Sequence, residues 1–577
     1  MKQNIRLFHH SSSLWEKFLD LNPQLFREIK GKLRTRNVVL AAAISSVTQF
    51  VLVVYLLGDL PDQDPQGILG VQHGRYGMGN IYEPLDSYHY GHLPYTKDLL
   101  NNWVINWQLL WLDLFMLLSI LSIFALLVVG TYMLIADTVE EESRGTLNFI
   151  RLTPQSASNI FLGKILGVPI LLYIVILLFL PLHLMAGLNA RIPWTLILGF
   201  YAVIIASCAF FYSLALLGSL MDFGLSSFKP WLASGVLGML LLVLTKTLFH
   251  GDYLTLDNPA GWLFLFNPSL VLSYLIEATY LPAHKTDFLP VEKLGQLLFY
   301  GQALWSKASL GISLIIFNFS LWTYWCWSIL KRRFHNPEYT LLSKIQSYWL
   351  TGWLVVIALG FTLQTTANHS LTEYFLFSQF FLSVWGLGLI AALSPHRQAL
   401  HDWARYRHQI NKSNNNLWKE LILGENSPST VAVAINVVMA IAYITPSIFL
   451  LLDLDRQFVF WGFILSAGNI MLWAIAAQFI LTAKTRRRAA WSVITVASII
   501  IVPPVGFGLA EIYPQTIPQA WLFSFIPTVA TEYATTSAIL LTILGQWLAV
   551  ALVGLQMTRK LKQAGASETK ILLSQSR

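Results

Sequence analysis

The sequence is poor in charged residues and in cysteine. Of its 577 residues only 12% are charged, whereas 55% are hydrophobic. Soluble domains carry about a quarter of charged residues, so this composition excludes a soluble globular protein. The two cysteines, Cys208 and Cys326, lie inside apolar stretches, which indicates packing residues rather than a disulfide or a metal site. The basic residues are spread over short loops, which argues against nucleic acid as a partner.

A phosphate-binding loop is also missing from the sequence. Such a loop needs Gly-x-x-x-x-Gly-Lys-Ser/Thr, so that its backbone N–H groups surround the phosphates. Neither Gly-Lys pair, at 31–32 and 163–164, is followed by Ser or Thr. No polar segment is long enough for a nucleotide-binding domain. We therefore expect a chain that is not an enzyme, with no catalytic, cofactor or metal site of its own.

Long apolar runs dominate what is present. A membrane helix needs about 20 mostly apolar residues. This length predicts an all-α polytopic membrane protein with about twelve transmembrane helices. The predicted spans are 38–57, 108–136, 164–188, 195–221, 230–249, 309–330, 348–367, 374–394, 430–452, 459–482, 489–510 and 536–557.

The positions of Lys and Arg predict the orientation of these spans. Cytoplasmic loops carry an excess of positive charge. With the N-terminus inside, the inner segments hold 30 of the 38 Lys and Arg residues. The sequence therefore predicts cytoplasmic N- and C-termini and a multi-pass protein of the cell's inner (plasma) membrane.

Two similar motifs predict an internal repeat. Trp262–Ser269 and Trp521–Thr528 share Trp-Leu-Phe-x-Phe-x-Pro at an offset of 259 residues. The same offset carries spans two to six close to spans eight to twelve. We therefore predict two parallel six-helix repeats. The first permease half would be 38–335, with a long outer loop at 58–107, and the second half 336–577.

The segment between the second and third spans combines charged and apolar side chains. We call residues 137–156 the first polar segment. A polar helix between two spans has little reason to carry Leu147, Ile150 and Leu152 beside its charges unless it docks on another protein. The alternative is an ordinary solvated loop at the lipid surface.

This segment resembles the coupling segment of type-2 ATP-binding-cassette (ABC) permeases. In that family an acidic stretch is followed by Gly-Thr-Leu, Leu-Thr-Pro and Gly-Lys; here these are residues 145–147, 152–154 and 163–164. The resemblance implies that this segment docks on a separate ATPase subunit. The residues to which it assigns this role are Glu140, Glu141, Glu142, Arg144, Gly145, Thr146, Leu147 and Pro154.

The repeat predicts a second coupling segment at 395–429, which we call the second polar segment. It has a Leu/Ile run followed by Ser-Pro-Ser but lacks Gly-Thr-Leu. A plain polar connector is an equally good interpretation of it. Its candidate contact residues are Trp418, Glu420, Glu425, Ser427 and Pro428.

The N-terminal part, 1–37, and two outer stretches complete the prediction. Residues 14–33 have the apolar spacing and basic residues of an amphipathic helix lying on the membrane, with Asn22 as N-cap and Pro23 in the first turn. Permeases of the resembled family typically have such an elbow helix. The stretches 250–307 and 511–535 are too apolar for free loops and too rich in Pro for spans, so we expect short re-entrant or interfacial helices.

Together these features predict the membrane-spanning permease subunit of an ABC exporter. ATP and Mg²⁺ would bind to partner ATPase subunits; the other expected partners are the lipid bilayer and accessory subunits. A twelve-span secondary carrier is the alternative, although ionisable residues within the spans are few, chiefly Asp113 and His183. A membrane-embedded lipid-processing enzyme is a third option. Its candidate ligands lie in the loop 58–107, where their spacing matches no compact ligand set; these are His73, Glu83, Asp86, His89 and His92.

Overall fold

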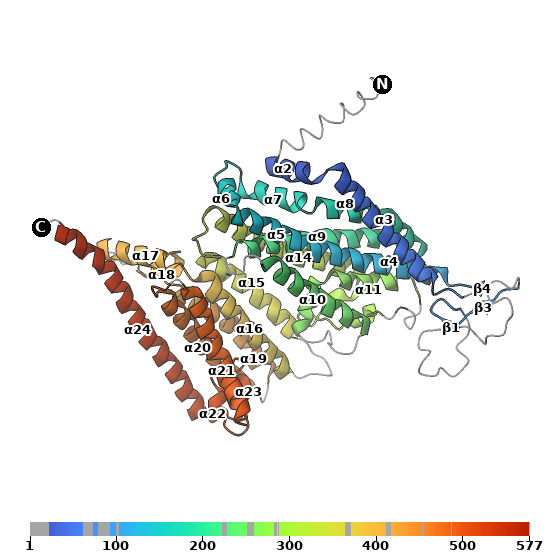
Figure 1. The fold of residues 1–577 in the computed structure, drawn as a ribbon. Helices are drawn as coiled ribbons and strands as arrows, with labels where there is room; N and C mark the ends of the chain where they lie inside the picture. Colours follow the sequence, from blue (N-terminus) through green and yellow to red (C-terminus); the bar gives the residue numbers. More distant parts are fainter. Residues whose placement is uncertain are drawn as a thin grey trace, which may run out of the picture. The chain divides into compact units, whose positions relative to one another are not determined.

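The computed structural model is a helical protein with twelve helices, among its described residues, that are long and apolar enough to cross a membrane (Figure 1). This confirms the predicted number of spans and the multi-pass membrane class. The structure describes residues 22–61, 73–78, 93–99, 103–221, 228–250, 259–281, 286, 288–363, 371–410, 417–452, 455–485 and 487–575.

The chain divides into two compact units, each described here by itself. Unit 1 comprises Met1–Leu256, Gly261–Leu297 and Ala303–His335, and unit 2 comprises Asp257–Ala260, Leu298–Gln302 and Asn336–Arg577.

The long and short helices up to residue 335 follow one another in chain order. They are α2 (Pro23–Lys32), α3 (Thr35–Leu57), α4 (Trp107–Phe124), the π-helical η1 (Ala125–Val129), α5 (Gly130–Ser143), α6 (Thr146–Arg151), α7 (Ala157–Gly167), α8 (Ile170–Asn189), α9 (Trp194–Ser219), α10 (Lys229–His250), η2 (Pro259–Phe266), η3 (Pro268–Val271), α11 (Leu272–Glu277), α13 (Val291–Leu294), η4 (Leu304–Ser306) and α14 (Ala308–His335).

Between α3 and α4 the described residues form two small antiparallel ribbons. Strand β1 (His73–Gly74) pairs with β2 (Leu93–Pro94), and β3 (Thr96–Lys97) pairs with β4 (Trp103–Val104). Of the candidate ligands in this loop, Glu83, Asp86, His89 and His92 lie outside the described residues.

The described residues of unit 2 form ten further helices. They are α15 (Lys344–Thr362), α16 (Leu371–Leu393), α17 (Arg397–Ile410), α18 (Leu417–Leu423), α19 (Thr430–Leu451), α20 (Arg456–Leu481), α21 (Arg488–Leu509), α22 (Pro518–Trp521), α23 (Thr528–Thr531) and α24 (Thr536–Gln575).

The two units share most of their helix pairings. In unit 1 the third span, α8, packs on the first and second spans, and the fourth span, α9, packs on the second and sixth. In unit 2 the third span, α19, packs on α15 and α16, and the fourth span, α20, packs on α16 and α24. Two pairings differ: α19 also packs closely on α20 whereas α8 has little contact with α9, and α10 packs mainly on α5 whereas α21 packs on α20.

The third predicted span, 164–188, was wrong at its start. Helix α7 ends at Gly167, and α8 begins only at Ile170. Pro169 lies between them, and a proline has no N–H with which to continue a helix from the preceding turn. Conversely, the second span is longer than predicted, because it continues through the π-helical turn η1 into α5 and ends at Ser143.

The short helices predicted for the two outer stretches are present in their described parts. Helix η2 and the η3–α11 pair meet at a bend of 93°, at Asn267, whose side chain accepts a hydrogen bond from the N–H of Ser269. The stretch 511–535 contains α22 and α23. The predicted cap of α2 is also confirmed: the Asn22 side chain accepts from the N–H groups of Gln24 and Leu25, and Pro23 is the first helical residue.

Candidate functional site

The first polar segment forms a helical hairpin at the end of the second span. Helix α5 extends the span to Ser143, and the chain then turns at Gly145 into α6. Gly145 has φ 73°, a left-handed conformation that glycine adopts without steric cost. The glycine of the Gly-Thr-Leu motif therefore sets the direction in which α6 leaves the span.

Helix α6 has one buried face and one exposed face. Leu147 and Ile150 are only 3% and 6% exposed, so they anchor the helix to the protein. Phe149 is 73% exposed and Leu152 84% exposed. Of the three apolar residues expected to make docking contacts, only Leu152 faces outward, and Phe149 joins it there.

The same segment also exposes charged side chains. Glu140 forms an ion pair with Arg144 along α5, and both side chains are mostly exposed. Glu142 and Pro154 are exposed as well. We define the docking surface as the exposed residues Glu140, Glu142, Arg144, Phe149, Leu152 and Pro154.

Glu141 belongs to a different environment, an ion cluster that joins three helices. Lys164 of α7, whose side chain is 1% exposed, has its Nζ 2.6 Å from Asp137 Oδ2 and 2.7 Å from Glu141 Oε2. Arg27 of α2 also pairs with Glu141. The carboxylate of Glu141 is therefore used inside the protein and is not available to a partner.

Helix α2 completes this cluster. Glu28 pairs with Arg27 at 3.0 Å and with Lys32 at 3.1 Å, and Lys32 Nζ also donates to the carbonyl oxygen of Val168. We call Arg27, Glu28, Lys32, Asp137, Glu141 and Lys164 the six-residue ion cluster. It ties the predicted elbow helix to the first polar segment and to the third span.

The electrostatics of the cluster favour the charged forms of Arg27 and Glu28. Burial opposes the charge of Arg27, but the carboxylates of Glu28 and Glu141 outweigh it and raise the Arg27 pKa. Burial also opposes the charge of Glu28, but Lys32, Arg27 and Lys164 outweigh it and lower the Glu28 pKa below its ordinary value. Both groups of α2 are thus held in their charged forms by neighbours of opposite sign.

Three of the cluster's carboxylates could be mistaken for a metal site. Glu28, Asp137 and Glu141 have oxygen atoms within 4.8 Å of one another, the one such group found among the described residues. The three cations Arg27, Lys32 and Lys164 balance their charges, and Lys164 Nζ lies between two of the carboxylates. The arrangement is a neutral ion cluster, and no uncompensated negative charge remains for a cation.

Two glycines let α2 approach α7 closely. A Cβ atom at Gly163 would lie 2.9 Å from the backbone nitrogen of Leu25, and one at Gly167 would lie 2.5 Å from Glu28 Cβ. The Asn22 side chain donates a hydrogen bond to the carbonyl oxygen of Asn159 across the same contact. The Gly-Lys motif therefore has two structural roles: the glycine admits α2, and the lysine neutralises α5.

The second polar segment is built around a different buried lysine. Lys344, at the start of α15 and 3% exposed, donates to the Leu421 carbonyl oxygen and the Ser427 hydroxyl, both at 2.6 Å, and to the Pro428 carbonyl oxygen at 3.1 Å. Ser427 and Pro428 are buried. These two candidate contact residues thus anchor the segment rather than offer a surface.

The remaining candidate contact residues of this segment differ in their partners and in their exposure. Glu420 accepts a hydrogen bond from the Trp403 indole and pairs with Arg407, both on α17. Trp418 is 68% exposed, and Glu425 is half-buried. Among its described residues the second segment therefore also exposes apolar side chains, Leu417, Trp418 and Leu423, together with the charged Lys419.

The two ionisable residues noted within the spans both have partners that the sequence did not reveal. Asp113 of α4 forms two contacts with the Arg75 guanidinium, at 2.6 and 2.8 Å. His183 of α8 lies 2.8 Å from the Ser119 hydroxyl and 2.7 Å from the Tyr201 hydroxyl. Both groups connect neighbouring elements of unit 1.

Comparison of the chain with protein-family models, with curated proteins and with solved structures finds no match.

Proposed function

We propose that this chain is the membrane-spanning permease subunit of an ABC exporter, with its spans forming the substrate pathway. The observation that carries the proposal is the α5–α6 hairpin. It projects Phe149 and Leu152 outward among exposed charges, while Leu147, Ile150 and the six-residue ion cluster fix its base. A rigidly based, partly apolar projection suits the transmission of motion from a partner.

Rigidity matters because a coupling element has to transmit force. Closure of two ATPase subunits on ATP and Mg²⁺ would push on the docking surface. The ion cluster would carry that push from α5 to α2 and α7, and hence to the second and third spans together. Rigid-body movement of packed helices is the common way in which such states interconvert.

The shared helix pairings of the two units support the proposed tandem repeat. In this proposal one chain supplies both halves of a permease, with cytoplasmic termini and the positively charged loops facing the inside of the plasma membrane. The complex would then contain one copy of this chain and two ATPase subunits. Accessory subunits would be additional partners.

Affinity purification of the full chain in mild detergent tests this proposal. We expect an ATP-binding-cassette ATPase to co-purify, with a native mass that corresponds to one copy of this chain and two ATPase subunits. Combining Phe149→Ser with Leu152→Ser should weaken recovery at least tenfold, since burial of each apolar side chain contributes about 1.5–3 kcal/mol. The matched control is Tyr280→Ser, which alters an exposed aromatic residue, 94% exposed, in unit 1 but outside the docking surface.

Charge reversal gives a second arm of the same experiment. Glu142→Lys should reduce ATPase recovery because an interface with mismatched charges costs several kcal/mol. Expression and thermal stability of this variant should match those of the unmodified chain, because Glu142 is exposed. Unchanged recovery in both the apolar and the charge variants, or ATP hydrolysis by the pure chain, would refute the proposal.

A further inference from the structure

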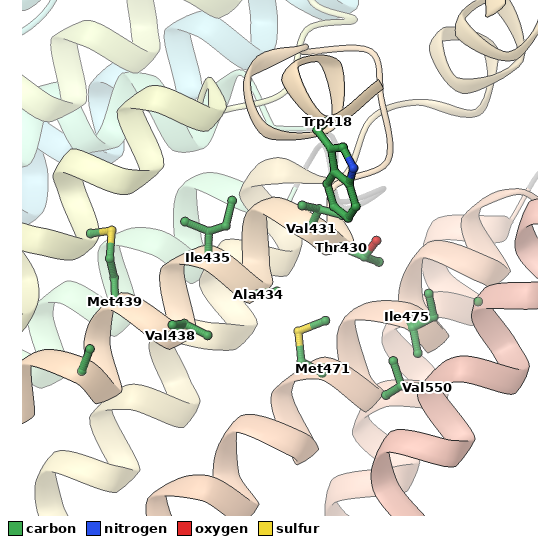
Figure 2. Close-up of a pocket in the computed structure, with 12 residues that line it drawn as sticks. Trp418, Thr430, Val431, Ala434, Ile435, Val438, Met439, Met471, Ile475 and Val550 are labelled. Carbon is green, nitrogen blue, oxygen red and sulfur yellow. The ribbon is translucent and has the colours of Figure 1, made fainter. Parts of the chain in front are cut away.

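Unit 2 contains an apolar groove on the outside of its helices. The groove has a volume of about 610 Å³ and lies between α19 and α24, with α20 as its floor. Ile435 and Val438 line it from α19, Met471 and Ile475 from α20, and Val550 from α24. Figure 2 shows these side chains along the groove, with Trp418 of α18 at one end.

The length of the groove matches one leaflet of a bilayer. Its lining residues on α19 run from Thr430 to Ala442. At a rise of 1.5 Å per residue this is about 18 Å, and half of the hydrocarbon core of a bilayer is about 15 Å thick. A groove of this depth fits a single acyl chain that extends from the membrane surface towards the bilayer centre.

The end of the groove at Trp418 has the character of a membrane interface. Tryptophan is enriched at the level of lipid headgroups, and Trp418 is 68% exposed. Lys419 follows it and is exposed. On α24, the Lys560 ammonium lies 3.7 Å from the centre of the Phe479 ring, and Phe479 is one helical turn beyond the groove-lining Ile475.

Glu420, which follows Lys419, is engaged by the Trp403 indole and by Arg407. Lys419 directly follows the groove-lining Trp418, and Lys560 lies on α24 six residues beyond the groove-lining Gly554. The end of the mainly apolar groove at Trp418 is therefore followed by a lysine on each of α18 and α24. A molecule that complements both features has an anionic head and a long hydrocarbon chain.

We propose that this groove binds one acyl chain of an anionic phospholipid of the bilayer, with the headgroup phosphate at the level of Lys419 and Lys560. Bound in this way, the lipid would contact α18 through Trp418 and hold the second polar segment at the membrane surface. This inference does not depend on the proposed transport function.

Native mass spectrometry of the full chain in detergent tests the groove. The chain is stripped of lipid and titrated with phosphatidylglycerol or with phosphatidylcholine of the same acyl chains. We expect one tight site that prefers phosphatidylglycerol. Gly554→Leu places a side chain in the groove, where a Cβ atom meets no other atom within 4 Å, and should weaken phosphatidylglycerol binding about tenfold by displacing two or more methylene contacts.

A matched control comes from the same helix. A Cβ atom at Gly545 also meets no other atom within 4 Å, and nine residues of separation place Gly545 on the face of α24 opposite Gly554. Gly545→Leu should leave phosphatidylglycerol binding unchanged. Equal binding by the Gly554→Leu and Gly545→Leu variants would overturn the proposal.

The headgroup arm uses a second pair of variants on α24. Lys560→Gln should abolish the preference for phosphatidylglycerol over phosphatidylcholine, whereas Lys562→Gln, which faces elsewhere on the helix, should preserve it. Equal affinity of the unmodified chain for the two lipids would overturn the proposal. So would a native mass showing a second copy of the chain whose association Gly554→Leu disrupts, because the groove would then be a protein interface.

Discussion

The two polar segments compensate the charge of a buried lysine in different ways. Each is anchored by one buried lysine, Lys164 in unit 1 and Lys344 in unit 2. Lys164 is neutralised by two carboxylates that other cations in turn stabilise. Lys344 is surrounded by two carbonyl oxygens and a hydroxyl. The first solution joins three helices through charged groups, whereas the second joins the start of α15 to carbonyl and hydroxyl oxygens 77 to 84 residues later in the chain.

This difference extends to what each segment leaves exposed. The charges that anchor the first segment belong to α2, α5 and α7 and not to α6, whose Phe149 and Leu152 are exposed. In the second segment the anchoring lysine binds the backbone of the α18–α19 connection directly, and Ser427 and Pro428 are buried as a result. A separate ion cluster therefore allows the first segment to be both firmly held and outwardly apolar.

The largest effect that separates the two solutions should come from removing each lysine. Lys164→Met leaves Asp137 and Glu141 without their buried partner and should lower the free energy of unfolding by about 3–5 kcal/mol. Lys344→Met leaves only neutral acceptors unsatisfied and should cost about 1–3 kcal/mol. Thermal unfolding in detergent measures both, and a larger loss for Lys344→Met would contradict the comparison.

A rescue experiment separates charge from packing. Combining Lys164→Met with Asp137→Asn and Glu141→Gln removes the excess negative charge. If the loss in Lys164→Met is electrostatic, the triple variant should recover a substantial part of the unfolding free energy. A triple variant less stable than the single one would show that the cluster acts mainly through its hydrogen bonds.

A smaller effect should follow from separating α2 and α7. Gly167→Ala forces a Cβ atom to within 2.5 Å of Glu28 Cβ, and such overpacking costs about 1–3 kcal/mol. The control is Gly235→Ala in α10, where a Cβ atom meets nothing within 4 Å; this change should stabilise the helix by about 0.5–1 kcal/mol. Faster proteolysis after Arg34 or Arg36 in Gly167→Ala alone would show that α2 has been released.

The smallest effect concerns pH. Lys32, Arg27 and Lys164, against the opposing effect of burial, hold the Glu28 pKa below its ordinary value of 4.5. The contribution of Glu28 to stability is therefore fully present above that value and is lost as the pH falls through the lowered pKa. The protection of the α2 amides against hydrogen exchange, expressed relative to the intrinsic exchange rate at each pH, should fall as the pH is lowered through this range, and Glu28→Gln should reduce this response.

The second polar segment is the internal reference for this measurement. The oxygen atoms that accept hydrogen bonds from Lys344 are two carbonyls and a hydroxyl, and they do not titrate in this range. Exchange in the α18–α19 connection should therefore change less than exchange in α2. An equal loss of exchange protection in both regions would indicate general unfolding rather than loss of the ion cluster.

The spans could be predicted from the sequence because hydropathy alone determines them. Nine of the twelve predicted spans agree with the structure to within five residues at both ends, and the second, third and twelfth deviate by six or seven residues at one end. The start of the third span could not be placed in this way, because the residues on both sides of Pro169 are apolar and a hydropathy window does not register the break. The cap at Asn22-Pro23 was predictable because it is a local pattern.

The ion cluster could not be predicted because its partners are far apart in the chain. Arg27 and Glu141 are separated by 114 residues, and single-sequence patterns carry no record of such pairing. The inward orientation of Leu147 and Ile150 could not be predicted for a different reason, because α6 has only six residues, too few to define a helical period. Gly163 and Gly167 do indicate a close helix contact in the sequence, because small residues four apart are a common site of close helix approach.

The long sequence separation within the cluster has a consequence for how the chain is made. Helix α2 leaves the ribosome well before its partners, since Lys32 donates to Val168, 136 residues later. The charges of Arg27, Glu28 and Lys32 therefore lack part of their partners while the first two spans are inserted, and α2 can dock only when α7, directly before the third span, has been made. The docking of α2 thus marks the completion of the first two spans and of α7 during synthesis, and a nascent chain arrested before Lys164 should leave α2 open to protease.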